Sequence, residues 1–476
     1  MRYIDDFLNT ITIYRLVLYV LIYFLISALG FSVFGLLPFQ SIDLLFTACV
    51  LVLVCWIINK IFAKIFNAPT NLESVYITAL ILSLIITPIN SLDKIPYLAA
   101  IGILAISSKY IFAINKKHIF NPTAFAVFVS LLIFRFGASW WVGNQYMLIP
   151  VLIGGLLVIR KVRHLSMITA FLVVYAVFTG PHLVQTILES PIFFFSLIIL
   201  TEPQTTPPTK KLQIIYGGLV GLISSYLSLE SALILGNIFS YIVSPKGKLL
   251  LKLKEKIQIA PDIYDFIFGL ENPMKYSAGQ YMEWTLGQKN PDSRGSRRYF
   301  TLASSSTEDN LKLGIKFYPN GSSFKNSLFN MKTGSQIVAS QLSGEFILPK
   351  DINKKLCFIA GGIGITPFRS MIKYLIDTNQ KRDITLLFSN KLKSDIVYKE
   401  IFDEAFKKLG VKTVYVNTDT MGFIDETMIR REVPNFKDRT FYISGPHSMV
   451  DAFEKTLKGM GISGSQIKID FFPGYA

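Results

Sequence analysis

The sequence predicts a polytopic α-helical membrane domain of about ten spans, followed by a small antiparallel β-barrel and a parallel α/β domain. Of the 476 residues, 51% are hydrophobic and only 17% are charged, whereas about 25% charged residues is usual for a soluble protein. The long apolar runs stop near residue 245, and short alternating segments, turns and charges follow from Lys246 onward. We therefore expect domains over residues 1–245, 246–350 and 351–476.

Apolar runs that suggest membrane spans recur throughout the first domain. They lie near residues 12–30, 43–59, 74–88, 96–114, 121–136, 147–159, 166–179, 190–201, 212–228 and 231–244. Several are shorter than the ~20 residues of a full crossing, which predicts broken or re-entrant helices. The first run lacks a small-residue cleavage site and is followed by further runs, so we expect a span there and not a signal peptide.

The charges of the loops predict the orientation of these spans. If the N-terminus is cytoplasmic, the loops on that side carry Lys60, Lys64, Lys116, Lys117, Arg160, Lys161, Arg163, Lys210, Lys211, Lys246 and Lys248. The opposite loops carry little more than Lys94 and Arg135. This asymmetry satisfies the positive-inside rule, and an even number of spans returns the chain to the cytoplasm. We expect a multi-pass protein of a bacterial-type cytoplasmic membrane with both termini cytoplasmic.

The cysteine spacing argues against disulfides and iron–sulfur clusters, and the lack of a reading motif argues against nucleic-acid binding. Cys49, Cys55 and Cys357 are too far apart for a disulfide framework or for the ligand spacing of an iron–sulfur cluster. The formal net charge of +16 is not accompanied by a nucleic-acid-reading motif. The basic excess instead fits cytoplasmic loops beside acidic lipid headgroups.

Two polar, helix-breaking clusters interrupt the apolar domain. One is Asn121-Pro122-Thr123, and the other runs from Thr201 to Pro208 and includes Glu202 and Thr205. Broken helices free backbone groups to bind a ligand or an ion inside a membrane protein. From the residues alone, an ordinary helix kink or a cytoplasmic turn is the favoured explanation of each cluster, and a ligand or ion site is the alternative.

Several ordered segments stand out over most of residues 70–245, and they are Tyr76–Leu80 with Thr87-Pro88, Phe120–Ala124, Gly154–Leu156 before Arg160-Lys161, and Thr201–Lys211. Through these segments the membrane domain resembles the flavin-carrying membrane subunits of the Na⁺-translocating NADH:quinone reductase and of the Rnf electron-transport complex. The resemblance implies about ten helices that hold a flavin, either FMN or riboflavin.

Two departures qualify this resemblance. The family attaches FMN to a threonine in a Ser-Gly-Ala-Thr motif, and the nearest match in this sequence is Phe136-Gly137-Ala138-Ser139. A non-covalently bound flavin is therefore the safer expectation, with Ser139 as the candidate for an ester. The family's Asp-Pro is Glu202-Pro203, which keeps the carboxylate. The residues that the resemblance indicates for this cofactor are Asn121, Thr123, Glu202, Thr205 and Ser139.

The barrel region carries a motif that binds flavin phosphates in other proteins. Arg298-Tyr299-Phe300-Thr301 resembles the Arg-x-Tyr/Phe-Ser/Thr motif of the ferredoxin–NADP⁺ reductase superfamily. The resemblance implies that Arg298 pairs with the FAD pyrophosphate, since a guanidinium bonds phosphate bidentately. It also implies that Phe300 packs on the flavin and that the Thr301 hydroxyl bonds the flavin N5 region. Gly321-Ser322-Ser323 resembles the second flavin-phosphate turn of this superfamily.

Two segments of the last domain indicate a nicotinamide nucleotide. Gly361-Gly362-Ile363-Gly364-Ile365-Thr366-Pro367 follows an apolar strand and opens a helix, where glycines let a dinucleotide approach the helix N-terminus. Ser444-Gly445-Pro446 with Met449 resembles the superfamily's Cys-Gly-Pro-x-x-Met turn beside the nicotinamide, with serine in place of cysteine. Phe471 or Tyr475, near the end of the chain, is the candidate to stack on the flavin.

These segments together predict a FAD-dependent NAD(P)H oxidoreductase in which Thr301 and Ser444 are the candidate catalytic residues. FAD accepts a hydride and can release electrons singly. We expect them to reach the membrane flavin and then a quinone or an extracytoplasmic acceptor. Lys391 and Lys393 could attract the 2′-phosphate of NADPH, so NADH and NADPH both remain open, as does the number of subunits.

Two rival functions share some of these features. A ferric-reductase-like enzyme would need pairs of histidines inside helices to bind haem, and His118, His164, His182 and His447, the four in the chain, lie in predicted loops or in the last domain. A transporter or ion pump with a regulatory redox module would use the broken helices at Asn121 and Glu202 for a solute or for Na⁺.

Overall fold

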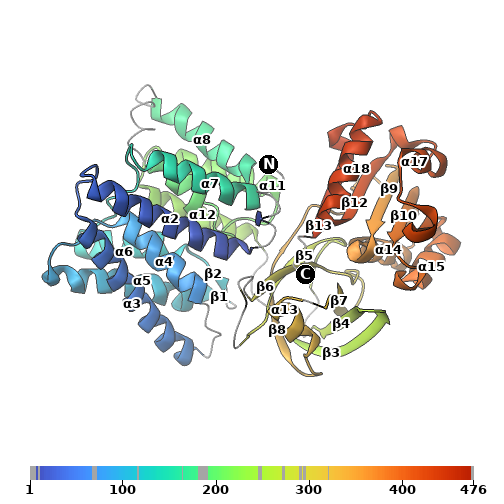
Figure 1. The fold of residues 1–476 in the computed structure, drawn as a ribbon, viewed down its shortest axis with the longest axis horizontal. Helices are drawn as coiled ribbons and strands as arrows, with labels where there is room; N and C mark the ends of the chain where they lie inside the picture. Colours follow the sequence, from blue (N-terminus) through green and yellow to red (C-terminus); the bar gives the residue numbers. More distant parts are fainter. Residues whose placement is uncertain are drawn as a thin grey trace. The chain divides into compact units, whose positions relative to one another are not determined.

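The chain forms two compact units, residues 1–248 and 249–476, each of which is described here by itself (Figure 1). The computed structural model describes all residues except 1–6, 9–10, 67–71, 115–116, 163, 181–190, 245–248, 271–273, 289–291, 293–295, 320 and 473–476. Tyr475 lies outside the described residues, as does the side chain of Phe471.

The first unit is helical, and a helix lies in each apolar run that the sequence shows. Its helices are α2 (Ile13–Val33), α3 (Ser41–Ile65), α4 (Leu72–Ile85), α5 (Ile95–Ile111), α6 (Pro122–Phe134), α7 (Leu148–Val162), α8 (Leu165–Thr179), α10 (Ile192–Phe194), α11 (Lys210–Ser224) and α12 (Leu229–Val243). A π-helical turn, η3 (Phe195–Ile199), continues α10. A two-stranded ribbon of β1 (Ala113–Ile114) and β2 (Lys117–His118) precedes α6.

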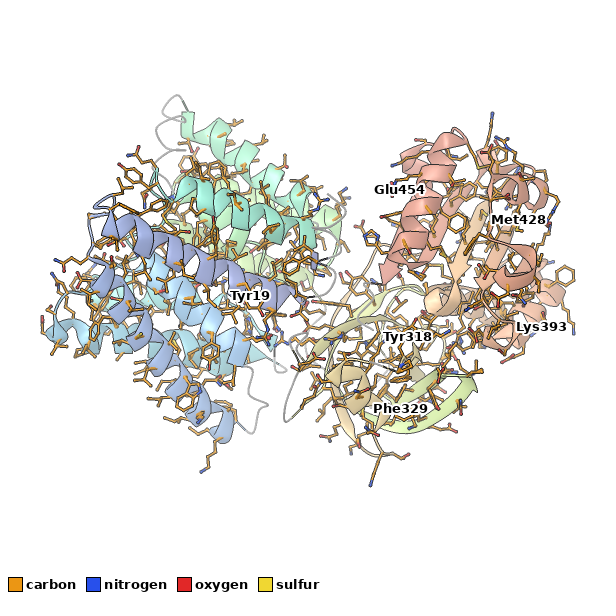
Figure 2. All side chains as sticks on the ribbon, in the orientation of Figure 1. Tyr19, Tyr318, Phe329, Lys393, Met428 and Glu454 are labelled. Atoms are coloured by element: carbon orange, nitrogen blue, oxygen red, sulfur yellow. The ribbon has the colours of Figure 1, made fainter. Side chains whose placement is uncertain are left out.

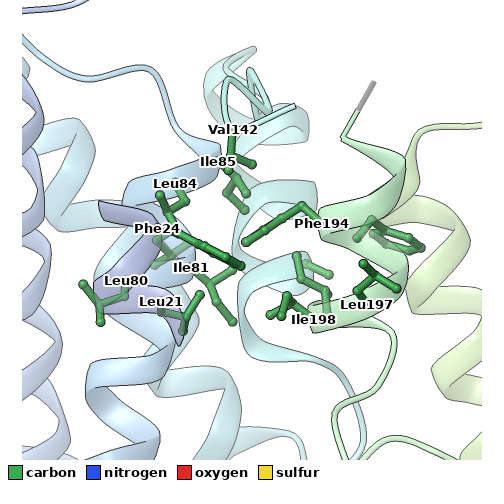
Figure 3. Close-up of a cluster of buried hydrophobic side chains, with 14 of the residues drawn as sticks. Leu21, Phe24, Leu80, Ile81, Leu84, Ile85, Val142, Phe194, Leu197 and Ile198 are labelled. Carbon is green, nitrogen blue, oxygen red and sulfur yellow. The ribbon is translucent and has the colours of Figure 1, made fainter. Parts of the chain in front are cut away.

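A single apolar core runs through this unit, and glycines bring its helices close together. Figure 3 shows Phe24, Ile81, Phe194 and Leu197 converging from α2, α4, α10 and η3. A methyl group at Gly221 of α11 would lie 2.6 Å from the carbonyl oxygen of Phe171 in α8. Small residues that let helix backbones meet in this way are typical of helix pairs in membranes.

The outer faces of the helical unit are apolar. Side chains more than half exposed lie on several of its helices, and they include Ile26, Leu53, Ile133, Ile149, Val177 and Ile242. Among the described residues, α2 and α3 are long and apolar enough to cross a membrane, whereas α4, α6, α8 and α12 are shorter apolar helices. The expected ten spans therefore remain a prediction.

The second unit begins with a six-stranded antiparallel sheet in the predicted barrel region. Its strands are β3 (Leu249–Ala260), β4 (Ile263–Gly269), β5 (Tyr281–Thr285), β6 (Arg297–Thr301), β7 (Asn310–Lys316) and β8 (Gln336–Ser343), in the order β6-β5-β8-β3-β4-β7. Alternation places Leu251 and Leu253 in the core and Lys252 outside. The short helix α13 (Ser323–Phe329) supplies Phe324 and Leu328 to the same core.

The remainder of the second unit is a five-stranded parallel sheet covered by helices on both faces, as the sequence predicts. Its strands are β9 (Leu356–Gly361), β10 (Ile384–Asn390), β11 (Lys412–Asn417), β12 (Thr440–Pro446) and β13 (Ile467–Phe472), in the order β11-β10-β9-β12-β13. Along β9, Phe358 packs against the side of α14 (Thr366–Asp377) and α15 (Lys399–Leu409). The neighbouring Ile359 packs against α17 (Glu426–Glu432) and α18 (His447–Gly459) on the other face.

The strand order reverses direction between β9 and β12. The chain proceeds outward from β9 through β10 to β11, and it then returns to form β12 and β13 on the other side of β9. Ligands of open α/β sheets bind at the carboxyl ends of the strands at such a switch point. Figure 2 shows the side chains of both units, including exposed Lys393, which follows the end of β10.

We predict that substitution of two glycines of α11, Gly218 and Gly221, will have different effects on stability. Gly221→Ala should destabilise the helical unit by about 1–3 kcal/mol, because the new methyl group overlaps the backbone of α8. Gly218→Ala is the matched control, since its methyl group would meet only Val174 at 3.7 Å. The control should be neutral or stabilising, because alanine favours helix by ~1 kcal/mol over glycine. Thermal unfolding of the full chain in detergent measures the stability of both variants. Equal effects would contradict the explanation that glycine permits the close contact between α8 and α11.

Candidate functional site

The two segments expected to bind the nicotinamide nucleotide meet at the switch point. Gly361 ends β9, and Ser444, Gly445 and Pro446 end the adjacent strand β12. The two strands are parallel, and Ser444 is in register with Ala360. Residues about 80 positions apart in the sequence therefore share one edge of the sheet, where a dinucleotide would be expected.

Two glycines allow this contact between the strand ends. A methyl group at Gly364 would lie 2.4 Å from the carbonyl oxygen of Ser444, and one at Gly361 would lie 2.2 Å from Met449 Sδ. The turn after β9 thus rests directly on the end of β12, and a larger residue would separate them.

A third glycine leaves the turn open on its other side. Gly362 has a φ of +53°, and a methyl group there would meet no described atom within 4 Å. Thr366 begins α14, with its hydroxyl donating to the carbonyl oxygen of Ile363 at 3.2 Å, and Pro367 lies in the first turn. The open glycine and the helix N-terminus are compatible with a bound phosphate.

The predicted flavin-phosphate residues of the barrel also lie together. Arg298 and Phe300 are two positions apart in β6, so both side chains lie on the same face and approach Phe324 of α13. The Arg298 guanidinium lies 5.3 Å from the centre of the Phe324 ring, and the centres of the Phe300 and Phe324 rings are 6.0 Å apart. Ser322 caps α13 by accepting a hydrogen bond from the amide of Lys325. Arg298 is therefore held beside the turn of Gly321, Ser322 and Ser323.

An anionic group is already bound at this turn. The amide of Ser323 donates to a carboxylate oxygen of Asp292 at 2.8 Å, and the Ser323 hydroxyl accepts from the Asp292 amide at 2.9 Å. A carboxylate at the start of a helix occupies the kind of position that a phosphate would take. The amide of Ser323 can thus bond an anion, and in this structure that anion is the Asp292 carboxylate.

Both candidate catalytic residues lie beside a third residue, Asp470, although only Thr301 bonds it. Thr301, at the end of β6, donates to Asp470 Oδ2 at 3.4 Å, and Asp470 of β13 is in register with Ser444 of β12. The Ser444 hydroxyl is fully buried and has no hydrogen-bond partner among the described residues. Sequence reasoning assigned no role to Asp470, although a carboxylate beside two terminal aromatic residues was an available signal.

The exposed side of β6 is held by a separate polar network. Tyr299 donates to Glu283 Oε2 at 2.9 Å and also contacts Tyr281 edge-on, with ring centroids 5.8 Å apart. Burial raises the pKa of the Tyr281 phenol, so this group stays protonated at neutral pH. Tyr299 therefore fixes the strand on the face opposite to Arg298, next to Tyr281 of the Gly279-Gln280-Tyr281 segment, which the sequence likens to a barrel strand of the superfamily.

In the helical unit, the two polar clusters of the sequence come together around Glu202. Oε2 of Glu202 accepts from the Asn121 amide at 2.9 Å and from the Thr205 hydroxyl at 3.2 Å. Asn121 caps α6 and also accepts from the Thr123 hydroxyl at 2.6 Å. The π-helical turn η3 ends three residues before Glu202, and such turns are frequent at functional sites.

Three further residues complete this cluster, and sequence reasoning did not select them for it. His118 Nε2 lies 3.4 Å from Glu202 Oε1, Asn237 accepts from the Asn121 backbone amide at 2.8 Å, and Asn237 donates to the Tyr216 hydroxyl at 3.1 Å. Asn237 and Tyr216 are fully buried. A buried asparagine within the apolar helix α12 was the signal that could have identified this site.

Ser139 does not join this cluster. It follows the C-terminal end of α6, whereas Asn121 caps the N-terminus, so the helix of 13 residues separates them by about 20 Å. Ser139 is exposed and its hydroxyl donates to the carbonyl oxygen of Ile85 at 3.3 Å. The structure therefore contains two separate candidate positions for a cofactor in the helical unit.

Comparison with known proteins identifies the second unit. Residues 250–346 match the oxidoreductase FAD-binding domain family, and residues 358–455 match the oxidoreductase NAD-binding domain family. Flavohemoprotein A of Dictyostelium discoideum is 25% identical over 208 residues, which cover 41% of this chain and 52% of that protein. NADH-cytochrome b5 reductase 1 of Ajellomyces capsulatus is 27% identical over 228 residues, which cover 44% and 73%.

The similarity to solved structures covers a comparable share of the chain. The cytochrome b5 reductase domain of Ulva prolifera nitrate reductase is 24% identical, and the match covers 48% of this chain and 98% of that domain with a TM-score of 0.41. The chain spans about half of the first of the curated relatives. The second unit therefore contains two domains that match the FAD-binding and NAD-binding oxidoreductase families, which is the domain pair that a FAD-dependent NAD(P)H oxidoreductase requires.

We predict that Arg298→Ala will lose FAD while the helical unit remains folded. Loss of hydrogen bonds to a charged group costs on the order of 1.5–3 kcal/mol, which corresponds to roughly 10- to 100-fold weaker binding. Flavin absorbance of the purified full chain measures occupancy. Lys254→Ala is the control, because Lys254 is an exposed cation of the same barrel. Full flavin occupancy in Arg298→Ala would refute the role of Arg298.

We predict that Gly364→Ala will weaken NAD(P)H binding by about 10-fold or more without loss of FAD. The added methyl group would overlap the backbone of Ser444 and Gly445 and would displace the turn from the end of β12. A titration that follows flavin reduction gives the dissociation constant. Gly459→Ala in α18 is the control, because a methyl group there meets no described atom within 4 Å. Unchanged affinity in Gly364→Ala would show that the close contact is not needed.

Proposed function

We propose that the chain is a membrane-bound electron-transfer enzyme. Electrons pass from NADH or NADPH through FAD to a second flavin, FMN or riboflavin, in the helical unit, and then to a quinone or an extracytoplasmic acceptor. The observation that carries this proposal is the union, in one chain, of a FAD- and NAD-binding reductase with a helical unit that encloses a polar cluster within an apolar exterior.

In the reductase, the chain's own residues bind and align the two cofactors. When bound, FAD takes a hydride from NAD(P)H and can release the electrons singly. Arg298 and the turn at Ser322 hold the flavin phosphates, while the turn at Gly362 holds those of the nucleotide. Thr301 and Ser444 lie where the barrel meets the parallel sheet, and we assign them the alignment of flavin and nicotinamide.

The membrane location is supported by the surface of the helical unit. Apolar side chains that are more than half exposed would be costly in water, whereas they suit lipid.

Polar side chains lie at the end of α5, beside the ribbon of β1 and β2. There Tyr110 contacts Asn59, and Lys109 donates to Ser74. The basic loops of the sequence assign this end to the cytoplasm.

The cluster around Glu202 is our candidate site for the second flavin. Two asparagines, a threonine, a histidine and a buried tyrosine offer both donors and acceptors, as a flavin ring or its ribityl chain requires. Ser139 is the alternative site, and there a hydroxyl would have to form a phosphoester. Extraction of flavin from acid-precipitated protein distinguishes the two, since FMN that stays bound to the precipitate would favour Ser139.

We predict that Asn121→Ala will slow electron transfer beyond FAD. Flavin reduction by NAD(P)H in the second unit should keep its rate, whereas reduction of a quinone should fall by about 10-fold or more, because the donor to Glu202 and the cap of α6 are removed. Glu230→Gln is the control, since Glu230 is another buried carboxylate of this unit and contacts Trp140, next to Ser139. If Glu230→Gln blocks quinone reduction and Asn121→Ala does not, the Glu202 site is excluded.

The same preparation tests the two rival functions. A Soret band in the absorption spectrum would contradict flavin as the membrane carrier and favour a haem enzyme. Coupling to ions is tested in proteoliposomes: NADH oxidation that responds to a Na⁺ gradient would support an ion pump at the Glu202 cluster, where a carboxylate lies next to a broken helix. A rate of NADH oxidation that is unchanged by the gradient and by ionophores would argue against an ion pump.

A further inference from the structure

Buried and partly buried ionic side chains join the barrel to the parallel sheet within the second unit. Arg369 of α14 is 3% exposed. Its guanidinium binds both carboxylate oxygens of Glu308, with Nη2 to Oε1 at 2.9 Å, and also donates to the carbonyl oxygen of Ala303 at 2.9 Å. Glu308 accepts in addition from the amide of Ser305 at 2.6 Å. One bidentate ion pair therefore connects the first helix of the sheet domain to the loop between β6 and β7.

A second buried pair lies next to the first. The hydroxyl of Tyr398 donates to Asp265 Oδ1 of β4 at 2.5 Å, and Lys312 lies 3.4 Å from Asp265 Oδ2. Tyr398 has a φ of +59°, which is strained for a tyrosine. A methyl group at Gly314 would lie 2.4 Å from the Tyr398 hydroxyl, so the barrel strand is shaped to admit this side chain. The Arg369 guanidinium, 5.7 Å above the Tyr398 ring, links the two pairs.

Burial disfavours the charged forms of the carboxyl groups in this cluster, and their partners favour those forms. Burial disfavours the charged form of Glu308, but the hydrogen bond and charge of Arg369 outweigh it and lower the pKa of the carboxyl. Burial raises the pKa of Asp265, against the effects of Tyr398 and Lys312. Well-packed apolar side chains would often hold two domains at least as firmly. Directional bonds instead specify one geometry, which indicates that orientation is what this contact controls.

The position of both pairs connects them to the cofactor sites. Arg369 lies one turn after Thr366, in the helix that opens with the glycine turn, and Ala303 lies two residues after Thr301. Tyr398 ends the loop that begins at Lys391, after β10. The Arg369–Glu308 pair therefore attaches the helix after the glycine turn to the loop that follows Thr301, and the Tyr398–Asp265 pair attaches the loop after β10 to strand β4.

We propose that the Arg369–Glu308 and Tyr398–Asp265 pairs are positioning residues that set the distance and angle between nicotinamide and flavin. Neither pair needs to touch a cofactor. Hydride transfer requires the reacting atoms to approach to roughly 3–3.5 Å, and a displacement of about 1 Å can cost on the order of 100-fold in rate. This inference concerns the FAD- and NAD-binding domains alone, so it does not depend on the route that electrons take in the helical unit.

The test is stopped-flow flavin reduction by NADH and NADPH in the full chain. For Arg369→Met and Glu308→Gln we expect the limiting rate at saturating nucleotide to fall by about 10- to 100-fold, with FAD content retained and the dissociation constant of the nucleotide within about threefold. Arg369→Lys should recover part of the rate. The Arg369→Met/Glu308→Gln double variant should lose no more than either single variant, because the two residues act as one pair.

Two further variants keep the result interpretable. Tyr398→Phe removes a single hydroxyl from the second pair without changing the charge, and it should also lower the limiting rate while FAD stays bound. Lys408→Met is the matched control, because Lys408 pairs with Glu404 on the exposed side of α15, with side chains 59% and 42% exposed. Unchanged limiting rates in both Glu308→Gln and Tyr398→Phe would overturn the proposal. So would losses of FAD or of nucleotide affinity with the limiting rate preserved, or an equal loss in Lys408→Met.

Discussion

The contact between the turn after β9 and the end of β12 is the constraint on which the reductase depends. Gly364 faces the carbonyl oxygen of Ser444 with no room for a methyl group. Because the strands are parallel neighbours, this contact places the glycine turn, the start of α14 and the Ser444 segment at one edge of the sheet. Everything that we assign to nucleotide binding follows from it, since the strand order reverses at this point and opens the sheet to a ligand.

Around this contact, polar groups that are removed from water define geometry more than they add stability. Arg369 and Glu308 lie at the boundary of barrel and sheet, and Thr301 reaches Asp470 across the same boundary. An ion pair with a buried partner gains little over apolar packing, but removing one partner strongly destabilises the fold because it leaves the other charge uncompensated. The two domains are therefore held in one arrangement, as a reaction between two bound cofactors requires.

In the helical unit, too, close backbone contacts and paired polar side chains occur together. Backbones meet at Gly217 and Gly221 of α11, where any side chain would strike α8. Such close packing leaves few places for polar side chains, yet Asn121, Asn237 and Glu202 converge from three parts of the chain and satisfy one another. Unpaired, each would cost several kcal/mol, on the order of 2–7, in an apolar environment. Their mutual satisfaction is what permits a polar site inside this unit.

Sequence alone determined the elements and the chemistry of the motifs, because both depend on local patterns. Apolar runs located the helices, alternation located the barrel strands, and Arg298, Gly361 and Ser444 were recognisable from their immediate neighbours. The tertiary structure decided which distant residues meet. Asp470 beside Thr301, Asn237 beside Asn121, and Arg369 beside Glu308 are contacts between residues far apart in the chain. A local signal can single out Asp470 or Asn237, but it cannot specify the distant residue that each contacts, since strand order and helix packing bring them together only when the chain has folded.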